Sequence, residues 1–156
     1  MPYANGRLPA RALSAIPGGR LRKGTPARSW LAMRYYIGRK TGDVWLTPTG
    51  PMSSYRTLQQ QQELWRRYTN GTGAIAARPG TSNHGSATSA AVDIPTPAMQ
   101  AAVRQYGYLF GWGILGGRIP SDSTSEAWHC RLNVQRLTPR ARLWYWRYRV
   151  AKRRQR

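Results

Sequence analysis

The chain contains few acidic residues, few histidines and almost no cysteine. Its 156 residues include five aspartates and glutamates, two histidines, one cysteine and one phenylalanine, whereas lysine and arginine together number 25. The formal net charge of +20 favours polyanions or anionic surfaces as partners, and charge alone does not choose among nucleic acid, acidic membranes and bacterial wall polymers. The single cysteine, Cys130, excludes an internal disulfide framework.

Long apolar runs are also missing. No stretch of about 18 apolar residues occurs, so no transmembrane helix is expected. The N-terminus carries arginines without an apolar segment of about 7–15 residues, and no signal peptide is predicted. The length suits one domain, and an apolar content of 40% with seven tryptophans and nine tyrosines indicates a folded core rather than disorder.

Both histidines and two of the five acidic residues lie in two short segments. Residues 78–93 contain His84 and Asp93, and Glu126 lies three residues before His129. Histidine and acidic side chains are not required on a surface composed mostly of arginine, but they are required in a metal site. Catalytic zinc takes three nitrogen or oxygen ligands and leaves one position for water. We expect His84, Asp93 and His129 to bind Zn²⁺, and Glu126 to act on the bound water as general base.

Ordinary structural roles are the alternatives for these residues. An isolated histidine such as His84 is usually a core or surface residue, and Glu126 suits a helix cap or a salt bridge. Cys130 directly follows a predicted ligand. A small buried hydrophobic residue is the preferred interpretation of Cys130 over a fourth metal ligand.

Several short motifs surround these residues in a definite order between about residues 48 and 130. They are Ser54-Tyr-Arg56-Thr, Gln59, Trp65-Arg-Arg-Tyr68, the run from Ala77 to His84 with Ser82-x-His84, then Ala91-x-Asp93, Phe110-Gly-Trp112 and Glu126-x-Trp128-His129. The set resembles the zinc signature of the VanY-type D-alanyl-D-alanine carboxypeptidase and L-alanyl-D-glutamate endopeptidase family. The resemblance implies a metallopeptidase, a hydrolase that degrades the cell wall by cleaving peptidoglycan stem peptides. Many members of this family are bacteriophage endolysins.

The resemblance also implies roles for residues beside the metal. Arg56 is expected to bind substrate and to polarise the scissile carbonyl as charge builds on its oxygen. Ser82 matches a serine that hydrogen-bonds the substrate. A surface arginine and a turn-forming serine are the respective alternatives. Trp128 is expected to pack beneath the metal.

One spacing departs from the family pattern. The family usually places six residues between the first histidine and the aspartate, including a glycine, whereas eight residues lie here between His84 and Asp93 and Ser89 occupies the usual glycine position. An even insertion keeps the facing of a strand, and a turn also accommodates it.

The sequence predicts an α+β fold: a small, mainly antiparallel sheet flanked by helices, of the D-Ala-D-Ala carboxypeptidase/Hedgehog-like kind that the resemblance implies. We expect a basic N-terminal arm over residues 1–26, a zinc peptidase domain over 27–135 and a basic, aromatic C-terminal helix or tail over 136–156. Predicted helices cover residues 26–39, 58–69, 97–110 and 139–152, and predicted strands cover residues 44–46, 91–94 and 126–129. Residues 52–56 are expected to form a further strand, or a strand end that leads into the helix at 58–69. The polar loop 116–125 is expected to shape the substrate pocket.

Arginine and aromatic residues alternate in the C-terminal segment from residue 140 onward. As a helix it places Leu143, Trp146 or Arg147, and Val150 on one face. A wall anchor, a membrane-surface helix and a nucleic-acid contact are open interpretations, and a docked helix with a solvated basic tail is the ordinary one.

The leading hypothesis is a zinc-dependent peptidoglycan peptidase, either carboxypeptidase or endopeptidase, that serves as a phage endolysin or virion-associated lysin. Its expected partners are peptidoglycan, anionic wall polymers and other virion proteins, with no specific nucleic acid. Such a protein acts from the host cytoplasm on the wall through holin pores, or from the virion. The alternatives are a non-catalytic wall-binding or virion structural protein with a degenerate metal site and, third, a basic nucleic-acid-binding protein.

Overall fold

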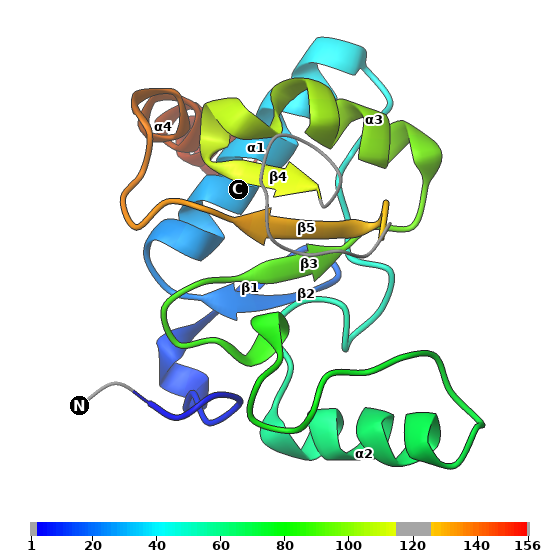
Figure 1. Cartoon of the computed structure of the whole chain (residues 1–156). Coiled ribbons are helices and arrows are strands. Elements are labelled where there is room, and N and C mark those ends of the chain that lie inside the picture. The colour runs from blue at the N-terminus through cyan, green and yellow to red at the C-terminus, as the bar shows by residue number, and fades with distance from the viewer. Residues whose placement is uncertain (1–2, 115–125, 156) are drawn as a thin grey trace.

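The computed structural model of the protein describes residues 3–114 and 126–155 (Figure 1). In chain order its elements are η1 (Ala10–Ala12), β1 (Leu13–Ile16), β2 (Gly19–Arg22), α1 (Thr25–Thr41), α2 (Leu58–Thr69), η2 (Asn83–Gly85), β3 (Ala91–Asp93), α3 (Pro97–Tyr106), η3 (Gly107–Phe110), β4 (Trp112–Ile114), β5 (His129–Leu132) and α4 (Pro139–Arg153). Helices and short antiparallel strands confirm the predicted α+β class.

A small antiparallel sheet lies at the centre of the molecule. Its strand order is β3-β5-β4, and β1 with β2 forms a separate hairpin. In Figure 1 the helices α1, α3 and α4 gather on one side of the sheet, whereas α2 lies apart from them at the opposite end of the molecule. The segment between α2 and β3 therefore connects the isolated helix to the sheet.

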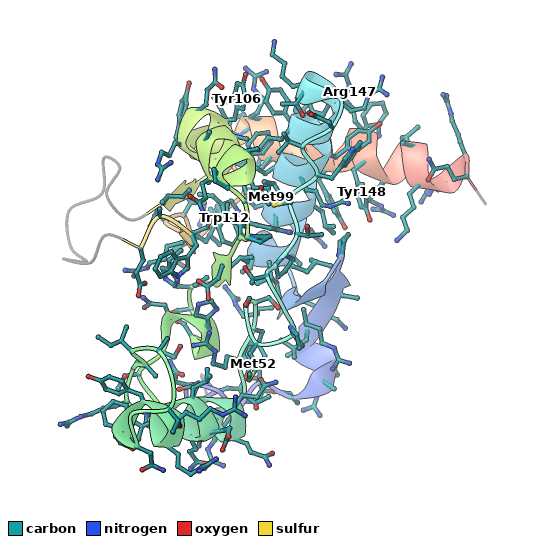
Figure 2. All side chains as sticks on the ribbon, turned by 90° about the vertical axis from the view of Figure 1, so that its right-hand side faces the viewer. Met52, Met99, Tyr106, Trp112, Arg147 and Tyr148 are labelled. Carbon is teal, nitrogen blue, oxygen red and sulfur yellow. The ribbon has the colours of Figure 1, made fainter. Side chains whose placement is uncertain are left out.

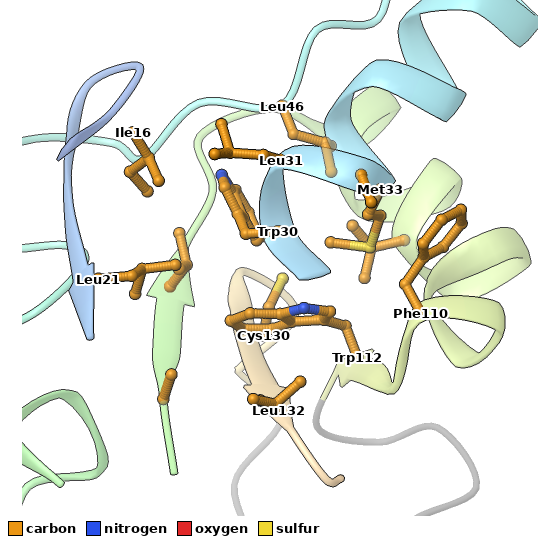
Figure 3. Packing of buried hydrophobic residues seen from close by; sticks show 14 of the residues in the cluster. Ile16, Leu21, Trp30, Leu31, Met33, Leu46, Phe110, Trp112, Cys130 and Leu132 are labelled. Carbon is orange, nitrogen blue, oxygen red and sulfur yellow. The ribbon is translucent and has the colours of Figure 1, made fainter. Parts of the chain in front are cut away.

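The core forms where α1 packs against the sheet (Figure 3). Trp30, Met33 and Ile37 are buried on one face of α1, as their spacing predicts. Trp30 meets Trp112 of β4 edge to face, with ring centroids 5.1 Å apart. The buried Ser29 hydroxyl accepts a hydrogen bond from Trp112 Nε1 at 3.0 Å, so the polar end of that indole is satisfied inside the core.

Three helices begin at residues that the sequence marks. Pro97 and Pro139 open α3 and α4, and the hydroxyls of Thr96 and Thr138 accept hydrogen bonds from backbone amides in the first turns. Thr57 caps α2 in a reciprocal capping box with Gln60. These local contacts explain why the predicted helix boundaries agree closely with the observed ones.

The N-terminal segment is more regular than expected. Instead of an irregular arm, residues 13–22 form the β1–β2 hairpin, which turns at Pro17 and Gly18. The hairpin buries Ile16 and Leu21 in the main core. Those two apolar side chains explain why the segment is folded. The three-part division of the chain at residues 26 and 135 stays a prediction.

The predicted strand at residues 44–46 is wrong. Its backbone groups bond to side chains of the preceding helix rather than to a neighbouring strand. Val44 N donates to Thr41 Oγ1 at 3.0 Å, and Leu46 O accepts from Arg34 Nε at 2.9 Å. The buried Leu46 side chain anchors this irregular segment to the core.

The predicted strand at residues 52–56 is also wrong. Tyr55 N donates to Arg20 O at 2.9 Å, whereas the neighbouring Arg56 N donates to His84 O at 3.1 Å. Because successive amides bond to different segments, residues 52–56 form a junction instead of joining a ladder. Strand β4, by contrast, was not predicted, since its three residues are too few to show an alternating pattern.

Helix α4 packs against α1 and leaves the predicted face outside. Leu143 and Trp146 are 49% and 61% exposed, respectively. The side of α4 that joins the core carries Ala141, Trp144, Tyr145 and Tyr148. The predicted loop 116–125 lies outside the described residues. Among the described residues, no helix is long and apolar enough to cross a membrane.

Candidate metal centre

Two of the predicted ligands lie opposite each other on neighbouring strands. Asp93 ends β3 and His129 begins β5, and the antiparallel register pairs them directly. Because side chains alternate between the two faces of a strand, the adjacent pair, Val92 with Cys130, points into the core instead. His84 joins them from η2, and one ligand atom from each of the three residues lies within 4.8 Å of the others.

The carboxylate of Asp93 lies between the two imidazole rings. His84 Nε2 is 3.2 Å from Asp93 Oδ2, and His129 Nδ1 is 2.7 Å from Asp93 Oδ1. Ligand atoms about 2.0–2.2 Å from a tetrahedral zinc ion are about 3.3–3.6 Å apart, which is close to the separation of His84 Nε2 from Asp93 Oδ2. Two imidazoles and one carboxylate also form a known donor set of catalytic zinc sites. The residues therefore fit a zinc ion.

A backbone carbonyl fixes the orientation of the His84 ring. His84 Nδ1 donates to Ser54 O at 2.8 Å, and both residues are buried. This bond places the ring proton on Nδ1 and leaves the lone pair of Nε2 directed toward Asp93. A second hydrogen bond of this kind is a usual feature of histidines that bind metals. The sequence motifs did not identify Ser54 as this partner, because its contribution is a backbone atom.

The β1–β2 hairpin is hydrogen-bonded to the segment that supports the candidate ligands. Arg20 of β2 donates its backbone N–H to Ser54 Oγ at 3.0 Å and accepts at its carbonyl from Tyr55 N. Next to them, Ser53 O accepts from Asp93 N at 2.8 Å. Residues 53–55 thus connect the hairpin to two of the three candidate ligands.

A buried glutamine holds the segment that carries His84. Gln61 is 2% exposed, and its amide donates to Asn5 Oδ1 at 2.9 Å and accepts from Gly80 N at 2.8 Å. Asn5 in turn donates to Ser82 O at 2.8 Å. The connection of Gln61 to the site depends on contacts between distant parts of the chain, which no local sequence pattern reveals.

The segment between His84 and Asp93 contains a turn at residues 86–89. Ser86 Oγ accepts hydrogen bonds from Thr88 N and Ser89 N, at 3.2 and 3.0 Å. Ser89 then donates its hydroxyl to Leu132 O at 3.0 Å. With the spacing of eight residues, Asp93 lies opposite His129 on β5, so the longer segment is compatible with the ligand pairing.

The pKa shifts of Asp93 and His84 favour the protonation states that metal binding requires. Burial raises the pKa of Asp93, but interactions with His129 and His84 outweigh this effect and hold that pKa well below its usual range. Burial lowers the pKa of His84, and interactions with Asp93 oppose this only in part. An ionised carboxylate and a neutral imidazole are the forms that bind metals.

Arg56 and Glu126 lie beside the three candidate ligands. All five line one pocket of about 640 Å³. Arg56 Nη2 is 3.6 Å from Asp93 Oδ2, and Glu126 O accepts from His129 N at 3.1 Å. Burial lowers the pKa of Arg56, and the negative charges of Asp93 and Glu126 oppose that change. A guanidinium remains protonated at neutral pH, so Arg56 places a positive charge in the pocket.

The remaining predicted residues have mixed outcomes. Ser82 lines the pocket, and its hydroxyl oxygen accepts from His84 N at 3.3 Å, which is the turn-forming role considered as the alternative. Trp128 does not pack beneath the ligands: it is 47% exposed and lines the pocket wall. Cys130 is fully buried in the core, and burial raises the pKa of its thiol. Its position agrees with the small buried hydrophobic interpretation.

The opposite wall of the pocket comes from α2 and the segment after it. Leu64 and Arg67 contribute from the helix, and residues 72–77 contribute from the following loop. Ile75 in that loop is 68% exposed. The pocket wall on this side therefore combines an exposed apolar side chain with the charged Arg67.

No protein-family model matches the sequence, and no curated protein does. Solved structures are similar in fold. The LdcB LD-carboxypeptidase, whose structure concerns peptidoglycan recognition, has a TM-score of 0.59 and 19% identity over 93% of this chain and 78% of its own. The vancomycin-resistance D,D-pentapeptidase VanY from a VanB-type cassette, solved with Zn(II), has a TM-score of 0.55 and 21% identity over 94% and 97% of the two chains.

A third similar structure is the L,D-carboxypeptidase DacB from Streptococcus pneumoniae. Its TM-score is 0.51 and its identity is 17%, over 80% of this chain and 73% of its own. The TM-scores of these three structures show a shared fold, and sequence identities this low show nothing beyond the fold. The fold predicted from the sequence motifs is therefore confirmed.

Proposed function

We propose that the protein is a zinc-dependent peptidase that hydrolyses amide bonds in the stem peptides of bacterial peptidoglycan. The convergence of His84, Asp93 and His129 at one pocket is the observation that carries the proposal. The neighbours in fold support the substrate class, since LdcB is described as recognising peptidoglycan, DacB is an L,D-carboxypeptidase and VanY is a D,D-pentapeptidase that was solved with zinc.

The residues around the ligands suit amide hydrolysis. A bound zinc ion would lower the pKa of a water molecule and polarise a carbonyl group. Glu126 is the candidate general base, which accepts the proton of the attacking water and passes it to the leaving amine. Arg56 provides positive charge where negative charge develops on the carbonyl oxygen. Ser82 is the candidate residue that hydrogen-bonds the bound peptide.

We further propose that the protein is a phage endolysin or a virion-associated lysin. The family resemblance of its motifs supports this role, and its net charge of +20 suits approach to the anionic polymers of a wall. In this role the protein reaches the wall from the host cytoplasm through holin pores, or from the virion together with other virion proteins.

Mass spectrometry of fragments released from purified peptidoglycan tests the proposed activity. The zinc-loaded protein should release stem-peptide fragments, and the mass of each fragment identifies the bond that is cut. A chelator should abolish release, and added zinc should restore it. The Glu126→Ala variant is the matched control, since it should bind zinc without cleaving. Binding to peptidoglycan without any released fragment would identify a wall-binding protein with a degenerate site and contradict the proposal.

A further inference from the structure

Helix α4 has apolar residues on two opposite faces. The inner face carries Trp144 and Tyr148 and packs against α1, where Tyr35 contacts both rings. On the outer face Leu143 and Trp146 are 49% and 61% exposed. A helix that only docked onto the protein would need the inner face alone. The outer face therefore requires a separate explanation.

The outer apolar residues form a stripe along the helix. Leu143, Trp146 and Val150 follow one another at spacings of three and four residues, so they share one side of α4. Val150 is partly exposed at the far end of the stripe. Figure 2 shows α4 on the outside of the molecule, with its C-terminal end extending away from the body. No described element covers this side.

Exposed arginines flank the stripe on both sides. At 100° per residue, one flank carries Arg142, Arg149 and Arg153, and the other carries Arg140, Arg147 and Arg154. The sequence of α4 contains no aspartate or glutamate. Arg147 also lies over the Trp144 ring, with its guanidinium carbon 4.8 Å from the ring centroid, which holds this side chain along its flank.

We propose that the outer face of α4 docks onto the surface of an anionic lipid bilayer. A stripe of Leu, Trp and Val gains free energy when it enters the boundary between headgroups and acyl chains, while the flanking arginines meet lipid phosphates. A hydrated polyanion such as nucleic acid or a wall polymer would use the arginines but offers the stripe no apolar environment. The stripe therefore favours a lipid surface over these polymers.

The helix lies on such a surface rather than crossing it, since no described helix is long and apolar enough to span a membrane. The candidate metal centre and α4 involve different side chains. Membrane docking therefore stands independently of the proposed peptidase activity. Together, the two would hold a wall-cleaving protein at the membrane side of the wall.

Co-sedimentation of the full chain with vesicles tests this inference. We expect binding to vesicles made of equal parts phosphatidylglycerol and phosphatidylcholine, and little binding to phosphatidylcholine alone. The Leu143→Ser/Trp146→Ser variant keeps every charge and should bind about tenfold more weakly, because it loses the apolar stripe. The Tyr108→Ser variant is its control: Tyr108 is 71% exposed on η3, and its loss should leave binding unchanged.

A second pair of variants tests the arginines. The Arg142→Gln/Arg149→Gln/Arg153→Gln variant should lose about two orders of magnitude in vesicle affinity. The Arg11→Gln/Arg39→Gln/Lys40→Gln variant removes the same charge from exposed positions elsewhere and should lose only a few-fold. Equal losses in the two triple variants would show that only net charge matters and overturn the proposal.

Tryptophan fluorescence distinguishes insertion from surface adsorption. Adding the anionic vesicles should shift the emission of the wild-type protein to shorter wavelength. The Trp146→Phe variant keeps an apolar side chain, so it should bind the vesicles but show a smaller shift. Two results would contradict a lipid surface as the partner. In the first, the Leu143→Ser/Trp146→Ser variant binds vesicles as tightly as the wild-type protein. In the second, the wild-type protein binds DNA more tightly than vesicles, and the same double substitution weakens the binding to DNA.

Discussion

Asp93 is the residue on which the candidate site most depends. Its carboxylate contacts His84, His129 and Arg56 through separate interactions. Sequence reasoning found these four residues from their rarity and their motifs, but it could not supply the contacts among them. The direct pairing of Asp93 with His129 depends on strand register. The orientation of His84 depends on the Ser54 carbonyl, which no side-chain pattern reveals.

Replacing Glu126 separates catalysis from metal binding. The Glu126→Gln variant should retain one zinc per chain, because Glu126 is not among the three grouped ligands. Its rate of stem-peptide hydrolysis should fall by about 10²–10⁴, the usual contribution of a general base. The measurements are the zinc content and the initial rate on a soluble stem peptide. A wild-type rate of hydrolysis in this variant would show that Glu126 is not the general base.

Replacing Arg56 tests electrostatic stabilisation in the pocket. The Arg56→Ala variant should lose about 10²–10³ in kcat, since it removes a partly buried positive charge beside the ligands. Arg20→Ala is the control, because the exposed Arg20 contacts the site through its backbone only. If Arg56→Ala changed KM alone, Arg56 would bind the substrate without stabilising the transition state.

At the scale of elements, the β1–β2 hairpin supports the Ser54 segment of the candidate site, and its sequence does not predict this role. The Pro and Gly residues near positions 17–19 suggest a turn, but they do not show that the following strand supports Ser54. A Cβ atom at Gly19 would overlap Ser54 Oγ, which indicates how closely the hairpin approaches the support of His84. Helices with capping residues were predictable because their determinants are local, whereas this support depends on tertiary contacts.

The Gly19→Ala variant tests the supporting role of the hairpin. The added methyl group should displace Ser54 and disturb the ring orientation of His84, lowering zinc affinity by about 10–100-fold. Gly50→Ala is the matched control, because a Cβ there meets no atom within 4 Å. Zinc titration by calorimetry measures both. Equal zinc affinity in the two variants would show that the hairpin does not position the site.

At the scale of the whole molecule, both ends of the chain contribute to one core. Ile16 and Leu21 near the N-terminus and Trp144 near the C-terminus pack with the central sheet and α1. The periodicity of the last helix identified the face that carries Leu143 and Val150, but it did not identify the aromatic face that packs against the core. That choice depends on the aromatic side chains of α1, such as Tyr35 and Tyr36, which contact Trp144.

The net charge of +20 should make activity on intact walls depend on salt. Raising the salt concentration screens attraction to anionic wall polymers, so the rate on purified walls should fall steeply. The rate on a short, uncharged stem-peptide analogue should change little over the same range. Parallel salt titrations with the two substrates provide the measurement. The same salt dependence for both would locate the effect in the pocket rather than in the overall charge.

The zinc stoichiometry of the purified protein, measured by metal analysis after dialysis, tests the central claim most directly. The wild-type protein and the Cys130→Ala variant should each hold one zinc per chain, because the ligands are His84, Asp93 and His129. The His84→Ala and Asp93→Ala variants should hold none while keeping their fold. A wild-type protein without zinc affinity, or zinc retained at full stoichiometry by both of these variants, would contradict the claim.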